Sequence, residues 1–227
     1  MLSWRWEVLR SQFPTCLNLG VMLDKHAKMD TQISSICRST HFHLRNTFHT
    51  IYVDKNCNNT ACPFTITCGL DYCNSLLYGL PHSQLDRLQR IQNIACRVVC
   101  WIPKAECVIP YMREQHWVPV KQRILFKVLL LTYRAYNSIA LRYLCDLVSP
   151  KEPTRWSLRR DDKLKLSKNV IRLKSYGGRC FEFSGAEQWN KLDIRVRKVK
   201  SLSSFKRSLK TTLFEQAYGI DKQWTHR

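Results

Sequence analysis

The chain has no long hydrophobic run. Apolar stretches such as Val98–Ile102 and Val128–Leu131 have five and four residues, whereas a membrane-spanning helix needs about 20. The first residues, Met1–Glu7, also lack the apolar core and the small-residue cleavage site of a secretory leader. We therefore expect no membrane partner and an intracellular protein, located in the cytoplasm or the nucleus.

The motifs of common catalytic sites are missing as well. The only adjacent glycines are Gly177 and Gly178, which are too few for a loop that cradles phosphates, and no H-E-x-x-H zinc motif occurs. The only adjacent acids, Asp161 and Asp162, lie between cationic residues, and no apolar strand leads into them as a two-metal site requires. A Cys–His nucleophile pair stays open, although no local signature favours one. We predict no catalytic residue, no cofactor and no metal.

Cysteine is abundant, with 11 residues. Four of them, Cys57, Cys62, Cys68 and Cys73, follow three histidines and invite a zinc interpretation. Their spacing contains no C-x2-C pair, and an apolar segment fills the central gap. Without a secretory leader we expect reduced thiols, and small buried thiols are favoured over a zinc site.

Acidic residues are scarce. Lys and Arg number 37 against 17 Asp and Glu, which gives a net charge of +20. Residues 151–227 alone hold twenty cations and eight acids. Such an excess destabilises a compact chain by self-repulsion, so it indicates a polyanionic partner. Nucleic-acid phosphates are the usual one, while anionic membrane surfaces and acidic proteins are the competing explanations.

The hydrophobic periodicity predicts a mainly α fold with a small β element. Apolar residues recur at helical spacing along several segments. The first predicted helix covers residues 29–50, with Ile33, Ile36, Cys37 and Leu44 inward, and the second covers 83–102 and is capped by Ser83. A short helix is predicted to begin at Pro110, and another helix after Pro119. The last predicted helix runs from Ser203 or Ser204 to Tyr218, with Phe205, Leu209 and Leu213 inward. Residues 1–24 are predicted to be extended and to end in a strand at Leu19–Leu23. A loop is expected at 52–63, short strands at 163–166 and 170–173, and a local aromatic core of Phe181, Phe183 and Trp189.

Cations form three groups on these predicted helices. At about 100° per residue, each of the first two groups falls within one sector of its helix, and the third lies at the start of the last helix. The groups are Arg87, Arg90 and Arg97; Arg123, Lys127 and Arg134; and Lys206, Arg207 and Lys210. A solvated surface is one interpretation. We favour contacts with phosphates, and at the last helix an anion near the free amides would relieve the conflict between cations and helix dipole.

Seven blocks of sequence follow one another over about residues 17–218. They are Leu19–Leu23, Ile36–Asn46, Leu70–Pro81, Leu85–Arg97, Ile109–Tyr136, Tyr176–Phe183 with Gln188–Leu192, and Leu202–Tyr218. In their order and spacing, these blocks resemble the C-terminal part of the reverse transcriptase of LINE-like (non-LTR) retrotransposons of the jockey and chicken-repeat kind.

The resemblance implies a position within a longer polyprotein. Residues 1–24 would be the remnant of a palm-end strand, 25–102 thumb-like helices, and 103–227 a basic C-terminal region that helps to bind RNA and target DNA. The metal-binding aspartates of the palm would lie upstream, so we expect no enzyme as the chain stands. The expected partners are the RNA or DNA backbone and the missing palm and fingers of the same polyprotein. The alternative is a non-functional or self-associating helical fragment with a protein-interaction role.

Overall fold

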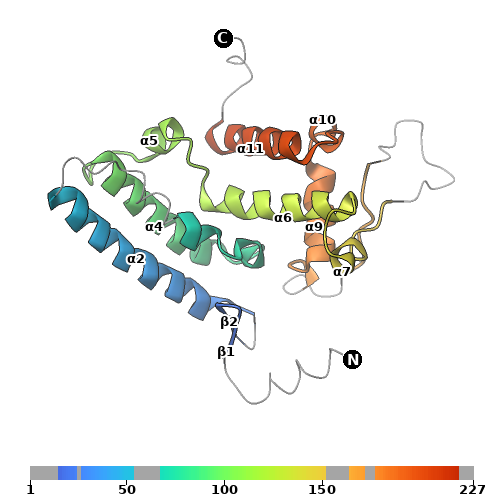
Figure 1. The fold of residues 1–227 in the computed structure, drawn as a ribbon, viewed down its shortest axis with the longest axis horizontal. Coiled ribbons are helices and arrows are strands. Elements are labelled where there is room, and N and C mark those ends of the chain that lie inside the picture. Colours follow the sequence, from blue (N-terminus) through green and yellow to red (C-terminus); the bar gives the residue numbers. More distant parts are fainter. Residues whose placement is uncertain (1–14, 25–26, 54–66, 152–163, 172–176, 220–227) are drawn as a thin grey trace, which may run out of the picture. The chain divides into compact units, whose positions relative to one another are not determined.

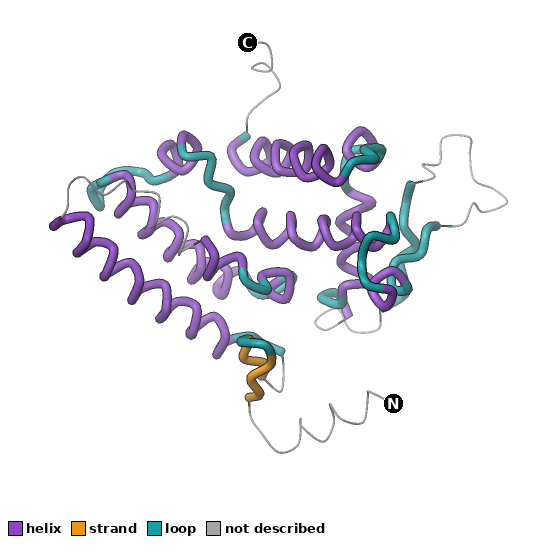
Figure 2. The backbone as a smooth tube through the Cα atoms, in the orientation of Figure 1, coloured by secondary structure: helices purple, strands orange, loops and turns teal. Residues whose placement is uncertain are grey.

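The computed structural model describes residues 15–24, 27–53, 67–151, 164–171 and 177–219. Helices dominate these residues, together with one small two-stranded sheet (Figures 1 and 2), so the predicted mainly α class is confirmed. The chain divides into two compact units, residues 1–120 and 121–227. No helix among the described residues is long and apolar enough to cross a membrane.

The first unit begins with an antiparallel hairpin of β1 (Thr15–Asn18) and β2 (Val21–Asp24). Thr15 pairs with Asp24 and Asn18 with Val21, so Leu19 and Gly20 form the turn. Both turn residues have positive φ, 47° and 79°, as a two-residue turn that follows the twist of the strands requires. The predicted strand at Leu19–Leu23 is therefore corrected to β2 and part of a turn, while residues 1–14 lie outside the described ones.

Helix α2 (Asp30–Val53) follows the hairpin and packs against it and against α4. The carboxylate of Asp24 accepts hydrogen bonds from the backbone N–H groups of Lys28 and Met29 at 3.1 and 3.0 Å, just before the helix begins. Of the predicted inward stripe, Ile33 and Leu44 are buried, whereas Ile36 and Cys37 are half-buried. The predicted loop at 52–63 overlaps the end of α2, and its residues 54–63 lie outside the described part.

Residues 67–71 are helical, and a 3-10 turn, η1 (Asn74–Leu77), leads to α4 (His82–Cys100). The N-cap of α4 is Pro81, so the prediction that Ser83 caps this helix is wrong. The helix ends at Trp101, which has a left-handed backbone with φ 54°. Its Leu88, Ile91 and Ala95 side chains are buried in the first unit.

Two prolines mark the next helix starts as predicted. Pro110 lies in the first turn of α5 (Ile109–Glu114), and α6 (Val120–Tyr136) begins directly after Pro119. A proline fits a first helical turn because the N–H that it lacks has no partner there. The amide of Gln92 in α4 donates to the Val118 carbonyl at 2.9 Å, which fixes the segment between α5 and α6.

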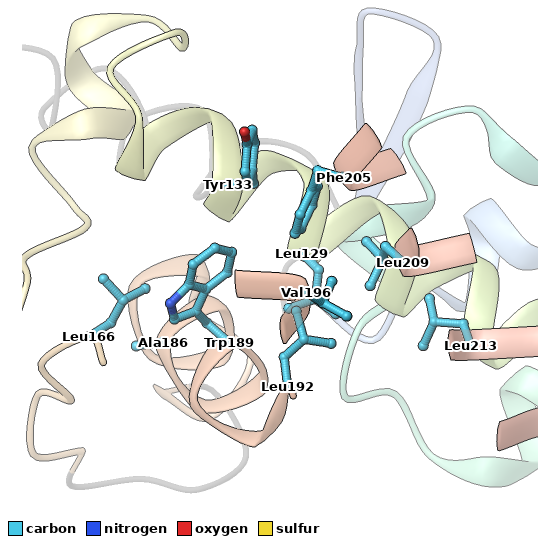
Figure 3. Close-up of a cluster of buried hydrophobic side chains, with 10 residues drawn as sticks. All are labelled: Leu129, Tyr133, Leu166, Ala186, Trp189, Leu192, Val196, Phe205, Leu209 and Leu213. Carbon is cyan, nitrogen blue, oxygen red and sulfur yellow. The ribbon is translucent and has the colours of Figure 1, made fainter. Parts of the chain in front are cut away.

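The second unit is built around buried side chains from helices that are distant in sequence. After α6 these helices are α9 (Phe181–Lys191), α10 (Ile194–Arg197) and α11 (Leu202–Tyr218), whereas the short helix α7 (Arg142–Cys145) has no buried residue. Figure 3 shows the cluster that α6, α9 and α11 form. Tyr133 of α6 stacks on Phe205 of α11 with ring centroids 4.0 Å apart, and Trp189 of α9 lies 6.0 Å from the Phe205 ring. The predicted inward face of α11 is confirmed, since Phe205, Leu209 and Leu213 are all buried.

The predicted aromatic core at 181–189 is only partly correct. Trp189 is fully buried, but Phe181 and Phe183 are half-buried and the aromatic partners of Trp189 come from α6 and α11. The predicted strands at 163–166 and 170–173 are wrong for their described residues. These form one antiparallel bridge, Pro150 with Leu166, and Val170 is 97% exposed.

Candidate nucleic-acid interface

The three α4 arginines have three different environments. Arg87 is half-buried, and its Nη2 donates to the Ser34 hydroxyl of α2 at 2.9 Å. Burial raises the pKa of the neighbouring Cys37 thiol, and the Arg87 guanidinium opposes that rise. Arg90 is exposed. Arg87 therefore joins α4 to α2, and Arg90 is the better placed of the two for a phosphate.

Arg97 serves the end of its own helix. Its guanidinium donates to the backbone carbonyls of Pro103 and Glu106, the latter at 2.8 Å. Cationic side chains near a helix C-terminus commonly satisfy carbonyls in this way. The contact folds the segment after α4 back onto the helix, so phosphate binding by Arg97 would compete with these bonds.

The α6 cations all lie in the second unit. Arg123 and Lys127 are half-buried, and Arg134 in the last turn is exposed. The opposite face of the helix carries the buried Val128 and Leu129. Of this group, Arg134 presents its charge most fully to solvent, at a helix end where a cation also favours the dipole.

Lys206, Arg207 and Lys210 are all exposed on α11, in its second and third turns. The N-cap of this helix is Ser201, whose hydroxyl lies 2.8 Å from that of Ser203 and caps no backbone amide. The first turn holds no acidic residue. The helix begins at Leu202, earlier than predicted, so Lys206 and Arg207 lie in its second turn rather than in the first, and Lys210 lies one turn further on.

Three further exposed cations, Arg195, Lys198 and Lys200, lie on α10 and on the link to α11, and helices α10 and α11 pack together. We call the following six residues the α10–α11 basic segment: Arg195, Lys198, Lys200, Lys206, Arg207 and Lys210. Between Leu192 and Phe214 the only carboxylate is Asp193. It accepts a hydrogen bond from the Arg195 backbone N–H at 2.9 Å and caps α10.

Sequence reasoning missed Arg195, Lys198 and Lys200, although the run Arg195–Lys200 was a visible signal. It contains four cations, of which one, Arg197, is buried and donates through Nε to the Leu192 carbonyl at 3.0 Å. A count of charge does not separate this buried arginine from its exposed neighbours. The structure separates them because Val196 and Arg197 face inward together.

The cysteines of the zinc interpretation lie partly outside the described residues. Cys57 and Cys62 fall there, Cys68 is exposed and Cys73 is half-buried. Within the described ranges, no three Cys, His, Asp or Glu side chains come together as a metal site would require.

Comparisons of the chain with protein-family models, with curated proteins and with solved structures find no match. The sequence and the positions of these cations are therefore the basis for assigning a function.

Proposed function

We propose that the chain is a truncated, reverse-transcriptase-derived protein of a non-LTR retrotransposon, and that it binds RNA or DNA backbone without sequence preference. The ordered sequence blocks support the origin. The single observation that supports the binding is the α10–α11 basic segment, six exposed cations accompanied by one carboxylate that is engaged in capping α10.

The proposed mechanism is electrostatic. A protein that neutralises phosphates with Lys and Arg releases condensed counterions, and this release supplies most of the free energy of non-specific binding. Contacts to phosphates carry no sequence information. The free amides in the first turn of α11 add a preference for an anion about one turn before Lys206 and Arg207. The palm and fingers of the same polyprotein are the proposed protein partner, and they would supply the catalytic aspartates.

The test is the salt dependence of binding to a labelled single strand, measured by fluorescence anisotropy. Changing Lys206, Arg207 and Lys210 together to Gln removes three phosphate contacts. We expect the slope of log K against log salt to become less steep by about 2, because each contact on a single strand contributes about 0.7.

A control triple variant changes three exposed cations elsewhere, Lys104, Arg113 and Lys121, to Gln. It makes the same change in net charge and should leave the slope within about 0.5 of its original value. Equal slopes for the two triple variants would overturn the assignment to α11. A wild-type chain that does not bind nucleic acid at about 50 mM salt would overturn the proposed function itself.

The second candidate function is a self-associating helical fragment. One observation favours it, because Ile139, Leu141 and Tyr143 around α7 are 52%, 67% and 62% exposed. This alternative also predicts an exposed apolar face on Leu85–Ile102, but Leu88 and Ile91 of that face are buried within the first unit.

A further inference from the structure

Helix α2 has an outer face that the charge analysis of the sequence did not select. Arg38, Phe42 and Arg45 are exposed on it, each about one helical turn from the next, and Phe42 is 61% exposed. Residues four and three apart share a helix face. The opposite face, with Ile33, packs inside the first unit and holds α2 in place.

The Phe42 ring is accessible for a planar ligand. The aromatic contact of Phe42 is with His43, whose ring meets it edge-on, with centroids 5.7 Å apart at 73°. A T-shaped contact occupies at most one of the two faces of the Phe42 ring, and the ring is 61% exposed, so it can still stack on a ligand. A single exposed apolar side chain is ordinary on a protein surface, so its meaning depends on the charges around it.

The charged side chains that α2 places on this face, Arg38 and Arg45, are both positive. The only carboxylate of α2 is Asp30 in its first turn, and that group accepts a hydrogen bond from Gln84 of α4. Within the described part of the chain, the side chains of Arg38 and Arg45 have no hydrogen bond or ion pair. An aromatic ring with a free guanidinium on each side complements a base with a phosphate on each side.

We propose that this face of α2 binds an unpaired nucleotide of a single strand. Phe42 stacks on the base, and Arg38 and Arg45 contact the phosphates that flank it. Surfaces that bind single strands combine such aromatic platforms with cations along the backbone. In a base-paired duplex the faces of the bases are covered by their neighbours. The two arginines can therefore contact its phosphates, but Phe42 cannot stack on a base. The inference rests on the proposed affinity for nucleic acid, but it concerns a different surface and requires a base.

The experiment compares two single strands of equal length on the full chain, one of oligothymidylate and one abasic. The abasic strand keeps every phosphate and has no bases. We expect Phe42→Ala to weaken binding of oligothymidylate about ten-fold, as loss of one stacked base does, and to leave the abasic strand unchanged. Phe42→Trp should retain the affinity. Arg38→Gln with Arg45→Gln should reduce the salt slope for both strands by about 1 to 1.5.

A matched control is Leu76→Ala, which removes another exposed apolar side chain, 47% exposed, from the same unit. It should leave both affinities unchanged, and circular dichroism should show an unchanged helix content for every variant. Equal weakening of the two strands by Phe42→Ala, or no weakening, would overturn the inference while wild-type binding still supports the proposed function. Polyglutamate that competes as well as oligothymidylate, and loses affinity with Phe42→Ala, would assign this face to acidic proteins instead.

Discussion

Cys96 of α4 is a fully buried thiol, with 0% of its surface exposed. Burial raises its pKa from the usual 9.0 to about 12, and the Cys100 thiol one turn later adds to the rise by its charge and by a hydrogen bond. The thiolate is the reactive form of cysteine. We predict that at pH 8 Cys96 reacts with a maleimide at least about 100-fold more slowly than the exposed Cys68 and Cys107.

Mass spectrometry after timed labelling under native conditions measures these rates. In urea the difference between Cys96 and the exposed thiols should disappear, because burial causes it. The raised pKa also has a consequence for stability. Below about pH 9 both the folded and the unfolded chain carry the neutral thiol, and Cys96 makes its full contribution to stability. This contribution is lost as the pH rises toward 12, because the thiol ionises at a lower pH in the unfolded chain than in the folded one. Native labelling of Cys96 at the rate of Cys68 would contradict the burial.

Trp189 shows what a local sequence pattern predicts for a single residue and what it does not. Its burial was predicted, but its partners were taken to be Phe181 and Phe183, which lie near it in sequence. In the structure the aromatic contacts come from Tyr133, Tyr136 and Phe205. The indole N–H donates to the Leu164 carbonyl at 2.8 Å. Periodicity identifies the inner face of a helix, whereas the choice of partner depends on tertiary packing, which no local pattern encodes.

At the level of a helix, α4 separates structural from exposed arginines. The Arg87 guanidinium bonds the Ser34 hydroxyl, so Arg87→Gln should lower the free energy of unfolding by about 1 to 2 kcal/mol and leave the salt slope unchanged. Arg90→Gln should change stability by less than about 0.5 kcal/mol and reduce the slope by about 0.7 on a single strand. Urea denaturation and the anisotropy series give the two quantities. If Arg87→Gln reduced the salt slope and Arg90→Gln lowered the stability, the roles given to the two arginines here would be wrong.

The close approach of α9 to α6 gives a second prediction for an element. A Cβ added to Gly185 would lie 2.6 Å from the Thr132 hydroxyl oxygen, which is fully buried and bonded to the Val128 carbonyl. Gly185→Ala gains about 1 kcal/mol of helix propensity, but we expect a net destabilisation of about 1 kcal/mol because overpacking costs more.

The double variant tests the cause. In a Thr132→Ala background the oxygen is gone, so Gly185→Ala should become neutral or stabilising, a coupling of about 1 to 2 kcal/mol. Gly69→Ala is the control, since its Cβ would meet the Thr40 hydroxyl at an ordinary 3.6 Å. Additive effects of Gly185→Ala and Thr132→Ala in urea denaturation would exclude the contact as the reason.

Helix ends were predicted well where proline determines them and less well elsewhere. The start of α6 after Pro119 follows from the fixed φ and the missing N–H of proline. At α4 the capping side chain of Ser83 predicts a later start, whereas the helix begins directly after Pro81. The turn at Leu19 was missed because leucine rarely adopts the left-handed conformation that it has there, with φ 47°.

Over the whole molecule, the composition predicts a polyanionic partner without indicating which surface would bind it. The excess of +20 is visible in the composition, and the cations of α11 were named with their exposed positions. The engagement of Arg87 and Arg97 with neighbouring groups was not predictable, because it depends on how α4 meets α2 and on the backbone after its last turn. The outer face of α2 was missed for the converse reason, since only the fold separates an exposed phenylalanine from a buried one.

The two proposed functions predict opposite responses of the whole chain to salt. A nucleic-acid-binding monomer of 26.9 kDa should lose its affinity for a single strand between about 50 and 200 mM salt and keep a constant mass in light scattering. Apolar self-association should strengthen with salt, because screening removes the repulsion between highly positive copies. We expect a constant mass at every protein concentration, also for a variant with Leu141→Ser and Tyr143→Ser. The contrary result is a mass that grows with protein concentration at roughly 300 mM salt and no longer grows in this variant. That result would identify the exposed side chains around α7 as an interaction surface.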